Sequence, residues 1–349
     1  MICLGLCLIV CGKCAIILAK GFIFHLKVKK FKFQSILGLS EFAMPSVKDR
    51  SRLLESIRAE INSVFIGRSE VVDLALTAVL ASGHVLIEDA PGSGKTALSR
   101  ALATCLGLDF QRIQCTNDLL PADITGMSVF DTKTSQFSFR EGPVFTQMLL
   151  ADELNRAPSR TQSSLLEAME ERRVTIDRET YTLPSPFLVV ATQNPREFIG
   201  TFDLPESQLD RFAISMDVGR PDKAIQKTIL AGMRQGRSPD QVKVMASPEV
   251  VLSLQEETAN LAIDDAILGY AIDLADAMEA EGHAGLSVRY RNQLVRLSQA
   301  AAMLAGRDFV APEDVQSVFY PSLRHRMTRL DISQRKAAVD QIVNAVPLP

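Results

Sequence analysis

Short apolar runs alternate with helix-like patterns through the middle of the chain. The runs 84–88 (HVLIE), 110–114 (FQRIQ), 148–151 (MLLA) and 187–192 (FLVVAT) have the length and apolar content of buried strands. The last two are apolar throughout, as in a parallel sheet that is covered on both faces. Helical patterns such as 160–173 lie between the runs. This alternation predicts a doubly wound α/β domain.

Two segments interrupt the alternation, and a different pattern follows it. SVFDTKTSQFSF and RVTIDRETYTL each alternate polar and apolar positions about a polar centre, which predicts two inserted hairpins. From about Asp222 onward, strand signals fade and helical patterns dominate, so a second, all-helical domain is expected. The predicted division is residues 44–221 for the core with its hairpins and residues 222–349 for the helical domain.

The first 43 residues differ from the rest of the chain. They contain four of the six cysteines and six lysines against one acid, Glu41, which is a local charge of +5. Lys13 and Lys20 interrupt the apolar stretch and leave it short for a spanning helix. We interpret residues 1–43 as non-native sequence, with translation starting at Met44, or as a weak membrane anchor; the first reading is favoured.

Composition narrows the classes of function. The chain is 47% hydrophobic and 23% charged, as in ordinary globular proteins. Its net charge is −3, and without the +5 of the first 43 residues the body carries −8. An acidic body disfavours nucleic-acid binding. We expect the basic patch RHRMTR to be a solvated helix end, and Cys105 and Cys115 to be buried in a protein of the reducing cytoplasm.

The segment 88–97 (EDAPGSGKTA) has the pattern of a phosphate-binding loop, except that Asp89 replaces the first glycine of G-x-x-x-x-G-K-[ST]. It follows a strand and opens a helix, the context in which backbone N–H groups converge on phosphates. Lys95 is expected to reach the β- and γ-phosphates and Thr96 to bind Mg²⁺. Asp89 ends the strand, so its side chain can point away from the nucleotide. The candidate nucleotide-binding residues are Asp89, Ala90, Pro91, Gly92, Ser93, Gly94, Lys95, Thr96 and Ala97.

Polar residues follow the next apolar strands. Asp152 and Glu153 come after MLLA, at an edge of the sheet that faces the ligand crevice. Asp152 suits the Mg²⁺ shell, and Glu153 suits a base that activates water. Asn194 follows FLVVAT and can hold the attacking water. From the sequence alone, Arg211 is interpreted as a surface or salt-bridged arginine. If the protein forms a ring, Arg211 could reach the γ-phosphate bound by a neighbouring subunit.

Together these motifs resemble the MoxR family of AAA+ ATPases. The resemblance covers nearly all of residues 50–330 and rests on EDAPGSGKT, TNDLLPADITG, FREGPVF, LLADELNRAPSRTQSSLLEAMEERRVTI, ATQNP, LPESQLDRF and APEDV. It implies an AAA+ P-loop NTPase core with a parallel five-stranded sheet, followed by a small all-helical lid domain. It also implies ATP and Mg²⁺ as cofactors and a cytoplasmic, typically hexameric ring. Asp89 is a feature of this family.

The resemblance also assigns roles to single residues. It matches Lys95 and Thr96 to the Walker A motif. It further matches Asp152 and Glu153 to Walker B, Asn194 to sensor 1, Arg211 to the arginine finger, and Arg156 to a second interface position. The two predicted hairpins match insertions that face the pore or a partner.

Sensor 2 is less sharply defined by the sequence. Relatives commonly have SPR where this chain has GLSVRYR. Ser287 can cap the following helix, which places Arg289 in the first turn, able to swing toward the γ-phosphate. Arg291 is the competing candidate, and we choose Arg289.

The resemblance implies that ATP hydrolysis drives chaperone-like remodelling or maturation of a client protein complex, together with a von Willebrand factor A-type partner. A nucleotide-gated assembly scaffold is one alternative, which the paired acids Asp152 and Glu153 disfavour. A nucleic-acid motor is the other, which the charge of the body disfavours.

Overall fold

The computed structural model describes residues 47–89, 92–133, 135–194, 200–219, 223–227, 241–282 and 284–349, together with the backbone of three strands nearer the N-terminus. The chain forms two compact units, Met1–Pro45 and Ser46–Pro349. In the first unit an antiparallel sheet has the order β1-β2-β3, with the strands β1 (Cys7–Cys11), β2 (Cys14–Ala19) and β3 (Phe22–Leu26). Among the described residues, none of the helices has the length and apolar character that crossing a membrane requires.

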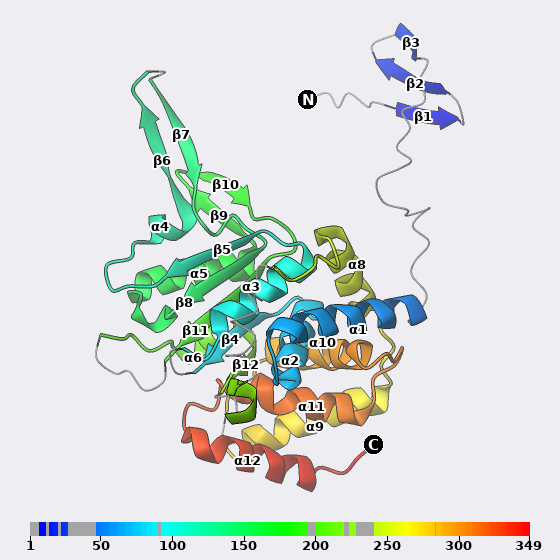
Figure 1. The fold of residues 1–349 in the computed structure, drawn as a ribbon, viewed down its shortest axis with the longest axis vertical. Helices are drawn as coiled ribbons and strands as arrows, with labels where there is room; N and C mark the ends of the chain where they lie inside the picture. The colour runs from blue at the N-terminus through cyan, green and yellow to red at the C-terminus, as the bar shows by residue number, and fades with distance from the viewer. Residues whose placement is uncertain are drawn as a thin grey trace. The chain divides into compact units, whose positions relative to one another are not determined.

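The second unit is built on a five-stranded parallel sheet with the order β12-β4-β11-β8-β5 (Figure 1). Its strands are β4 (His84–Glu88), β5 (Phe110–Gln114), β8 (Met148–Asp152), β11 (Leu188–Gln193) and β12 (Phe212–Met216). The predicted parallel five-stranded sheet is confirmed. The edge strand β12 is the one that the apolar runs did not single out, although all five of its residues are buried.

Alternate side chains of the strands divide the core into two apolar clusters. Val85 and Ile87 of β4 belong to one cluster and Leu86 to the other, because successive side chains point to opposite faces of a sheet. The helices α1 (Val47–Val64), α2 (Ser69–Leu80) and α3 (Lys95–Leu106) contribute to the first cluster, and α5 (Ser159–Glu171) contributes to the second. Both faces of the sheet are therefore covered, as the apolar strands predicted.

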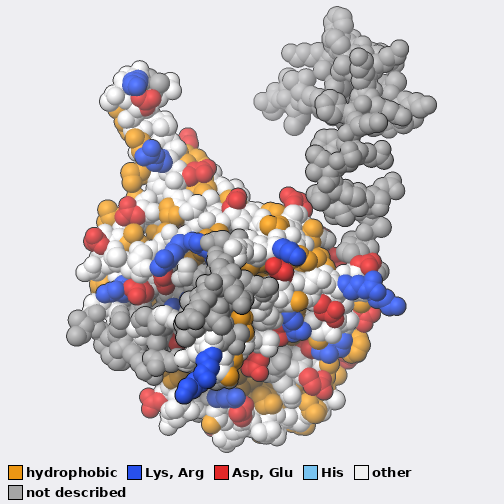
Figure 2. Space-filling model, in the orientation of Figure 1, with side chains coloured by type: hydrophobic (Ala, Val, Ile, Leu, Met, Phe, Trp, Pro, Cys, Tyr) orange, Lys and Arg blue, Asp and Glu red, His pale blue; other side chains and the backbone are white. Residues whose placement is uncertain are grey.

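Both segments with period-two alternation form hairpins, β6 (Gly126–Asp131) with β7 (Gln136–Glu141) and β9 (Arg173–Ile176) with β10 (Glu179–Thr182). The β6–β7 hairpin projects from the end of the core (Figure 1). Phe139 of β7 stacks on Tyr181 of β10 with 4.0 Å between the ring centroids, so the two hairpins pack on each other. Nearer the tip, Phe130 and Phe137 are exposed, and Figure 2 shows apolar side chains along this hairpin.

After β12 the described residues form helices and the loops that connect them, and the single β feature among them is an isolated bridge between Ala262 and Phe309. Its helices are α8 (Pro248–Ala259), α9 (Asp265–Ala280), α10 (Val288–Leu304), α11 (Pro312–Leu323) and α12 (Ile332–Ala345). Leu294 and Leu297 of α10 join the same apolar cluster as α2. The helical lid is thus confirmed, and it shares a core with the α/β part.

Candidate nucleotide-binding site

The loop between β4 and α3 has the backbone of a phosphate cradle. Gly92 and Gly94 have φ angles of 81° and 97°, in the left-handed region that glycine adopts without strain. α3 begins at Lys95, so the N-terminus of a buried helix lies directly behind the loop. Lys95 Nζ donates a hydrogen bond of 2.8 Å to the backbone oxygen of Asp89. Ala90 and Pro91 lie outside the described residues.

The Asp89 side chain is turned toward the strand at the edge of the sheet. Its Oδ2 accepts a hydrogen bond of 2.8 Å from the backbone N–H of Gly219, which follows β12. Its own N–H donates to the backbone oxygen of Gln193 at 3.2 Å. Asp89 therefore joins the start of the loop to the ends of the two strands that flank β4, and the bond to the Gly219 N–H is one that a glycine at position 89 could not make.

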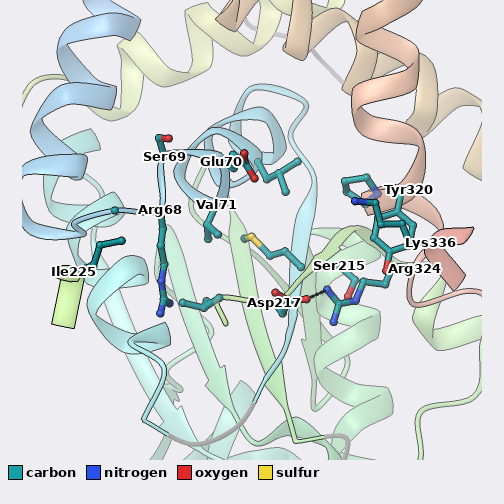
Figure 3. A pocket seen from close by; sticks show the side chains of 15 residues that line it. Arg68, Ser69, Glu70, Val71, Ser215, Asp217, Ile225, Tyr320, Arg324 and Lys336 are labelled. Carbon is teal, nitrogen blue, oxygen red and sulfur yellow. Dashed lines mark hydrogen bonds and ion pairs between the residues drawn. The ribbon is translucent and has the colours of Figure 1, made fainter. Parts of the chain in front are cut away.

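A cavity of about 680 Å³ lies beside the loop, and Figure 3 shows the side chains around it. One wall comes from Arg68 and Ile225, and another from Tyr320, Arg324 and Lys336 of the helical part. Arg68 connects the cavity to the loop, because its Nη1 donates to the backbone oxygen of Ser93 at 3.2 Å. The cavity thus lies between core and lid, next to the loop.

Asp152 is the last residue of β8 and is buried, with both carboxylate oxygens hydrogen-bonded. Oδ1 accepts from the hydroxyl of Thr192 at 2.6 Å. Oδ2 accepts from Arg112 Nη2 at 2.7 Å, within an ion pair. Charge-assisted bonds of this kind fix the direction in which a carboxylate points.

Glu153 follows β8 in a left-handed conformation, with φ 56° and ψ 48°. That conformation is costly for a residue with a Cβ and persists only where the surroundings enforce it. Its N–H donates to Thr192 Oγ1 at 2.9 Å. Its Oε2 accepts from Gln114 at 3.0 Å and from Arg156 at 2.9 Å. Arg156, the second interface candidate, therefore contacts the candidate base of its own subunit.

The strand β11 brings Asn194 to the same edge of the sheet. Asn194 directly follows β11 and is buried. Because β4, β8 and β11 are neighbouring parallel strands, their carboxyl ends place the loop, the Asp152–Glu153 pair and Asn194 side by side. The structure thus brings together the sequence-predicted residues of the core.

Arg211 and Arg289 lie at the amino ends of the parallel strands, opposite the carboxyl ends that hold the loop and the acids. Arg211 immediately precedes β12, whose first residue pairs with His84 at the start of β4. Both arginines form ion pairs with Glu170 of α5, Arg211 through Nε at 3.0 Å. They line a cavity of about 320 Å³ together with His84 and Gln293. The structure therefore joins Arg289 to Arg211 and places it away from the loop of its own chain.

The competing sensor 2 candidate has a different environment. Arg291 forms ion pairs with Asp276 at 2.6 Å and Glu279 at 2.8 Å, both on α9. Ser287 caps α10 as expected, because its Oγ accepts from the N–H of Tyr290 at 3.1 Å. Arg291 is thus tied within the helical part, whereas Arg289 reaches the core.

The expectation of a solvated RHRMTR segment is wrong for residues 324–327, which are buried, whereas Thr328 and Arg329 are exposed. Arg324, His325 and Arg326 are at most 7% exposed. Arg324 lies 3.4 Å from Glu88 and also pairs with Asp217. Arg324, His325 and Arg326 face carboxylates and backbone oxygens of the core, so they join the lid to the sheet. Figure 2 shows acidic and basic side chains interspersed over the visible face.

The residues present fit a magnesium ion. Mg²⁺ prefers hard oxygen donors and usually binds through one or two protein groups together with phosphates and water. The Thr96 hydroxyl belongs to the first turn of α3, which follows β4. Asp152 is the last residue of β8, and β11 alone separates β8 from β4 in the sheet. Thr96 and Asp152 are the residues that would hold the ion.

Comparisons with known proteins agree with this arrangement. The family described as "ATPase family associated with various cellular activities (AAA)" matches residues 84–214, and the AAA lid domain matches residues 275–346. Chaperone MoxR1 of Mycobacterium tuberculosis is 36% identical over 312 residues, covering 85% of this chain and 82% of that protein. The chain belongs to the MoxR family of AAA+ ATPases.

Other relatives extend this finding. YeaC of Bacillus subtilis, described as uncharacterized, is 40% identical over 309 residues and covers 86% of this MoxR-family chain and 97% of its own length. Protein MoxR of Paracoccus denitrificans is 29% identical over 338 residues, which cover 87% of this chain and 98% of that protein. The crystal structure of a candidate ATPase from Cytophaga hutchinsonii superposes with a TM-score of 0.78 at 34% identity, covering 87% of this chain and 97% of that one.

Sequence reasoning did not identify several polar residues of the site. They are Arg68, Arg112, Gln114, Glu170 and Thr192. Gln114 and Thr192 carry a usable signal, because each stands at the carboxyl end of a strand next to the one that ends in Asp152. Arg68 and Glu170 carry none, because they lie on helices or loops whose neighbours only the tertiary fold decides.

Proposed function

We propose that this MoxR-family protein hydrolyses ATP as a homo-oligomeric, hexameric ring in the cytoplasm and uses the energy to remodel or mature a client protein complex, with a von Willebrand factor A-type protein as its partner. One observation carries the proposal. The loop and the acids lie at the carboxyl ends of the strands, while the arginine pair lies at their amino ends. A single chain thus holds both halves of a hydrolysis site without being able to bring them together.

The nucleotide would occupy the loop and the adjoining cavity. Lys95 and the loop N–H groups bind the phosphates, and Lys95 exchanges its bond to the Asp89 oxygen for a phosphate oxygen. The cavity offers apolar side chains and the Tyr320 ring to a base, with Arg68 and Lys336 at its walls. Binding there would contact core and lid together, which makes lid position depend on the nucleotide.

Hydrolysis would use Glu153 as the general base. The water oxygen attacks the γ-phosphorus, the bond to the β–γ bridging oxygen breaks, and the water proton passes to the Glu153 carboxylate. Asn194, on the adjacent strand, orients the water. Magnesium held by Thr96 and Asp152 would neutralise part of the phosphate charge. Gln114 and Arg156 hold the Glu153 carboxylate until nucleotide is in place.

The ring supplies the missing positive charge. β4 spans five residues, about 16 Å. Arg211 lies beside the first residue of β4 and the loop follows the last, so the side chain of Arg211 cannot reach the loop of its own subunit. In a ring, Arg211 and Arg289 would face the γ-phosphate bound by the adjacent subunit, where an arginine is worth roughly 10³–10⁵ in rate. The Glu170 carboxylate keeps the two guanidinium groups together.

The client-remodelling part of the proposal is supported by two features. MoxR1, which is similar over most of the chain, is described as a chaperone. The β6–β7 hairpin exposes Phe130 and Phe137, and contiguous apolar surface of this kind is typical of protein-interaction sites. Movement of the lid would then shift the packed pair of hairpins against a client.

The test is the ATPase rate of the full chain against its concentration. We expect the rate per subunit to rise with concentration, since the site is completed by a neighbour. Glu153→Gln and Arg211→Ala should abolish turnover while nucleotide still binds. Arg291→Ala, which breaks only contacts within the helical part, should retain most of the rate.

Two results would overturn the proposal. Nucleotide binding without Glu153-dependent turnover at any concentration would favour an assembly scaffold. Salt-dependent binding to single- or double-stranded DNA in a gel-shift assay, with turnover stimulated by the DNA, would favour a nucleic-acid motor.

A further inference from the structure

Thr192 is a polar residue in the middle of the sheet with no exposure to solvent. It lies on β11 opposite Ile87 of β4, one residue beyond the pairing of Ala191 with Ala151 of β8. Its neighbours along β11 from Leu188 to Ala191 are apolar and pack in the two core clusters. A buried hydroxyl in such a position requires partners, because an unpaired polar group in the interior is costly.

The Thr192 hydroxyl makes two hydrogen bonds, both to the acidic pair. It donates to Asp152 Oδ1 at 2.6 Å and accepts from the N–H of Glu153 at 2.9 Å. One oxygen atom therefore binds the side chain of the first acid and the backbone of the second. The directions are fixed, because a carboxylate can only accept and an N–H can only donate.

These two bonds act on the most strained part of the site. Glu153 has φ 56°, a conformation that costs on the order of 1–3 kcal/mol for a residue with a Cβ. The N–H bond to Thr192 stabilises that conformation and so sets where the Glu153 carboxylate starts. The neighbouring Asp152 is fixed by Thr192 on Oδ1 and by Arg112 on Oδ2. The Arg112 side chain is long and partly exposed, whereas Thr192 is buried and β-branched. Of the two groups that hold the Asp152 carboxylate, Thr192 is therefore the more rigid.

The same strand also carries Asn194, two residues beyond Thr192. A displacement of β11 thus moves Asn194, Asp152 and Glu153 together through one buried hydroxyl. We propose that Thr192 is a positioning residue of the hydrolysis site, whose hydroxyl holds Asp152 and Glu153 in register with Asn194. The proposal rests on the ATPase function above, and it concerns how the site is held, since Thr192 contacts the acids and is not itself a catalytic residue.

The test compares Thr192→Val with Thr192→Ser in the full chain. Valine keeps the shape and removes the hydroxyl, while serine keeps the hydroxyl and removes one methyl group. Thr146→Val is the matched control, because Thr146 is also buried, just before β8, and its hydroxyl donates to the backbone oxygen of Asp109 at 2.8 Å, away from the acids. All three variants should lower the thermal midpoint, so stability alone does not distinguish them.

The distinguishing measurements are kcat, KM and the affinity for a fluorescent ATP analogue with Mg²⁺ and with EDTA. We expect Thr192→Val to lower kcat by about tenfold to a hundredfold, since a misplacement of about 1 Å can cost that much, with KM for ATP changed less than about threefold. Magnesium should tighten binding of the analogue to wild type and to Thr146→Val, but much less to Thr192→Val. Thr192→Ser should restore both kcat and the magnesium effect.

Three results would overturn the proposal: wild-type kcat and magnesium effect in Thr192→Val, equal losses in Thr146→Val, or no restoration by serine. Its failure is separable from failure of the proposed function. If the wild-type chain shows no turnover dependent on Glu153, the ATPase proposal fails, whereas the magnesium effect on analogue binding still decides the role of Thr192.

Discussion

Arg324 of the helical part forms a buried ion pair with Glu88, the residue that ends β4 and precedes the phosphate loop. The Arg324 Nε and Glu88 Oε2 atoms are 3.4 Å apart, and their side chains are 8% and 6% exposed. Glu88 also accepts hydrogen bonds from Gln193 at 2.7 Å and Ser215 at 2.8 Å. One carboxylate thus joins three strands of the core to the lid, directly behind the loop.

Replacing Arg324 with methionine should destabilise the protein. Removing one partner leaves Glu88 as a buried charge with only neutral partners, and breaking a buried pair in this way typically costs about 3–5 kcal/mol. The free energy of unfolding, measured with urea, should fall by about that amount. Adding Glu88→Gln to Arg324→Met should recover part of the loss. Arg173→Met, which breaks an exposed pair with Glu171, should change it by less than about 0.5 kcal/mol; equal effects from the two arginines would contradict the argument.

The position of Arg211 predicts complementation between two inactive variants. Glu153→Gln lacks the base but carries Arg211, and Arg211→Ala carries the base but lacks the arginine. In mixed rings some interfaces pair an intact base with an intact arginine from the neighbour. We expect each variant alone to be inactive and the mixture to regain a substantial fraction of the wild-type ATPase rate. If Arg211 acted on its own subunit's nucleotide, every subunit would stay defective and mixing would restore nothing.

Much of the core could be predicted because its strands carry an unusually simple pattern. Runs such as MLLA and FLVVAT are apolar on both faces, so they identify parallel strands, and residues just beyond them must lie at one edge. That placed Asp152, Glu153 and Asn194 together without knowledge of the strand order. The edge strand β12 was not singled out, although FAISM is as long as HVLIE; its serine is buried and satisfied by the carboxylate of Glu88, a partner that local sequence does not reveal.

The relation of the lid to the core could not be predicted. Arg324 looked like a surface residue because its partner Glu88 lies 236 positions earlier in the chain. Arg289 was correctly placed in the first turn of its helix, but the partner that it reaches, Glu170, depends on how α10 packs against the core. Local patterns fix capping and periodicity, whereas contacts between distant segments depend on tertiary packing.

Two glycines should respond oppositely to alanine. Gly126, at the base of the β6–β7 hairpin, has φ 90°, and an added Cβ would overlap the backbone oxygen of Arg140. Gly269 lies inside α9, where an added Cβ meets nothing within 4 Å. We expect Gly269→Ala to raise the free energy of unfolding by about 0.5–1 kcal/mol and Gly126→Ala to lower it by more than that. A stabilising Gly126→Ala in urea unfolding would contradict the close approach of Gly126 to the backbone of Arg140.

Buried histidines predict a loss of stability on acidification. His84 is 7% exposed and neutral: Nε2 donates to the backbone oxygen of Met169 at 3.2 Å, and Nδ1 accepts from the N–H of Val189 at 3.0 Å. Burial lowers the pKa of His84 from 6.5 to about 4. Burial also lowers the pKa of His325 well below its usual value, chiefly by desolvation and then by the charge of Arg326.

The sign of the effect follows from proton binding. Between pH 6.5 and about 4 the unfolded chain binds a proton at His84 that the folded protein does not, so stability rises with pH across this window. The contribution of His84 is fully present above pH 6.5 and is lost as the pH falls through 4, a change of about 3 kcal/mol. Carboxylates add to the same trend, so the comparison of wild type with His84→Gln isolates the histidine. In urea unfolding at several pH values, His84→Gln should be less stable at pH 8 but should lose less stability between pH 6.5 and 4. Parallel curves for the two proteins would rule out His84 as a source of the acid sensitivity.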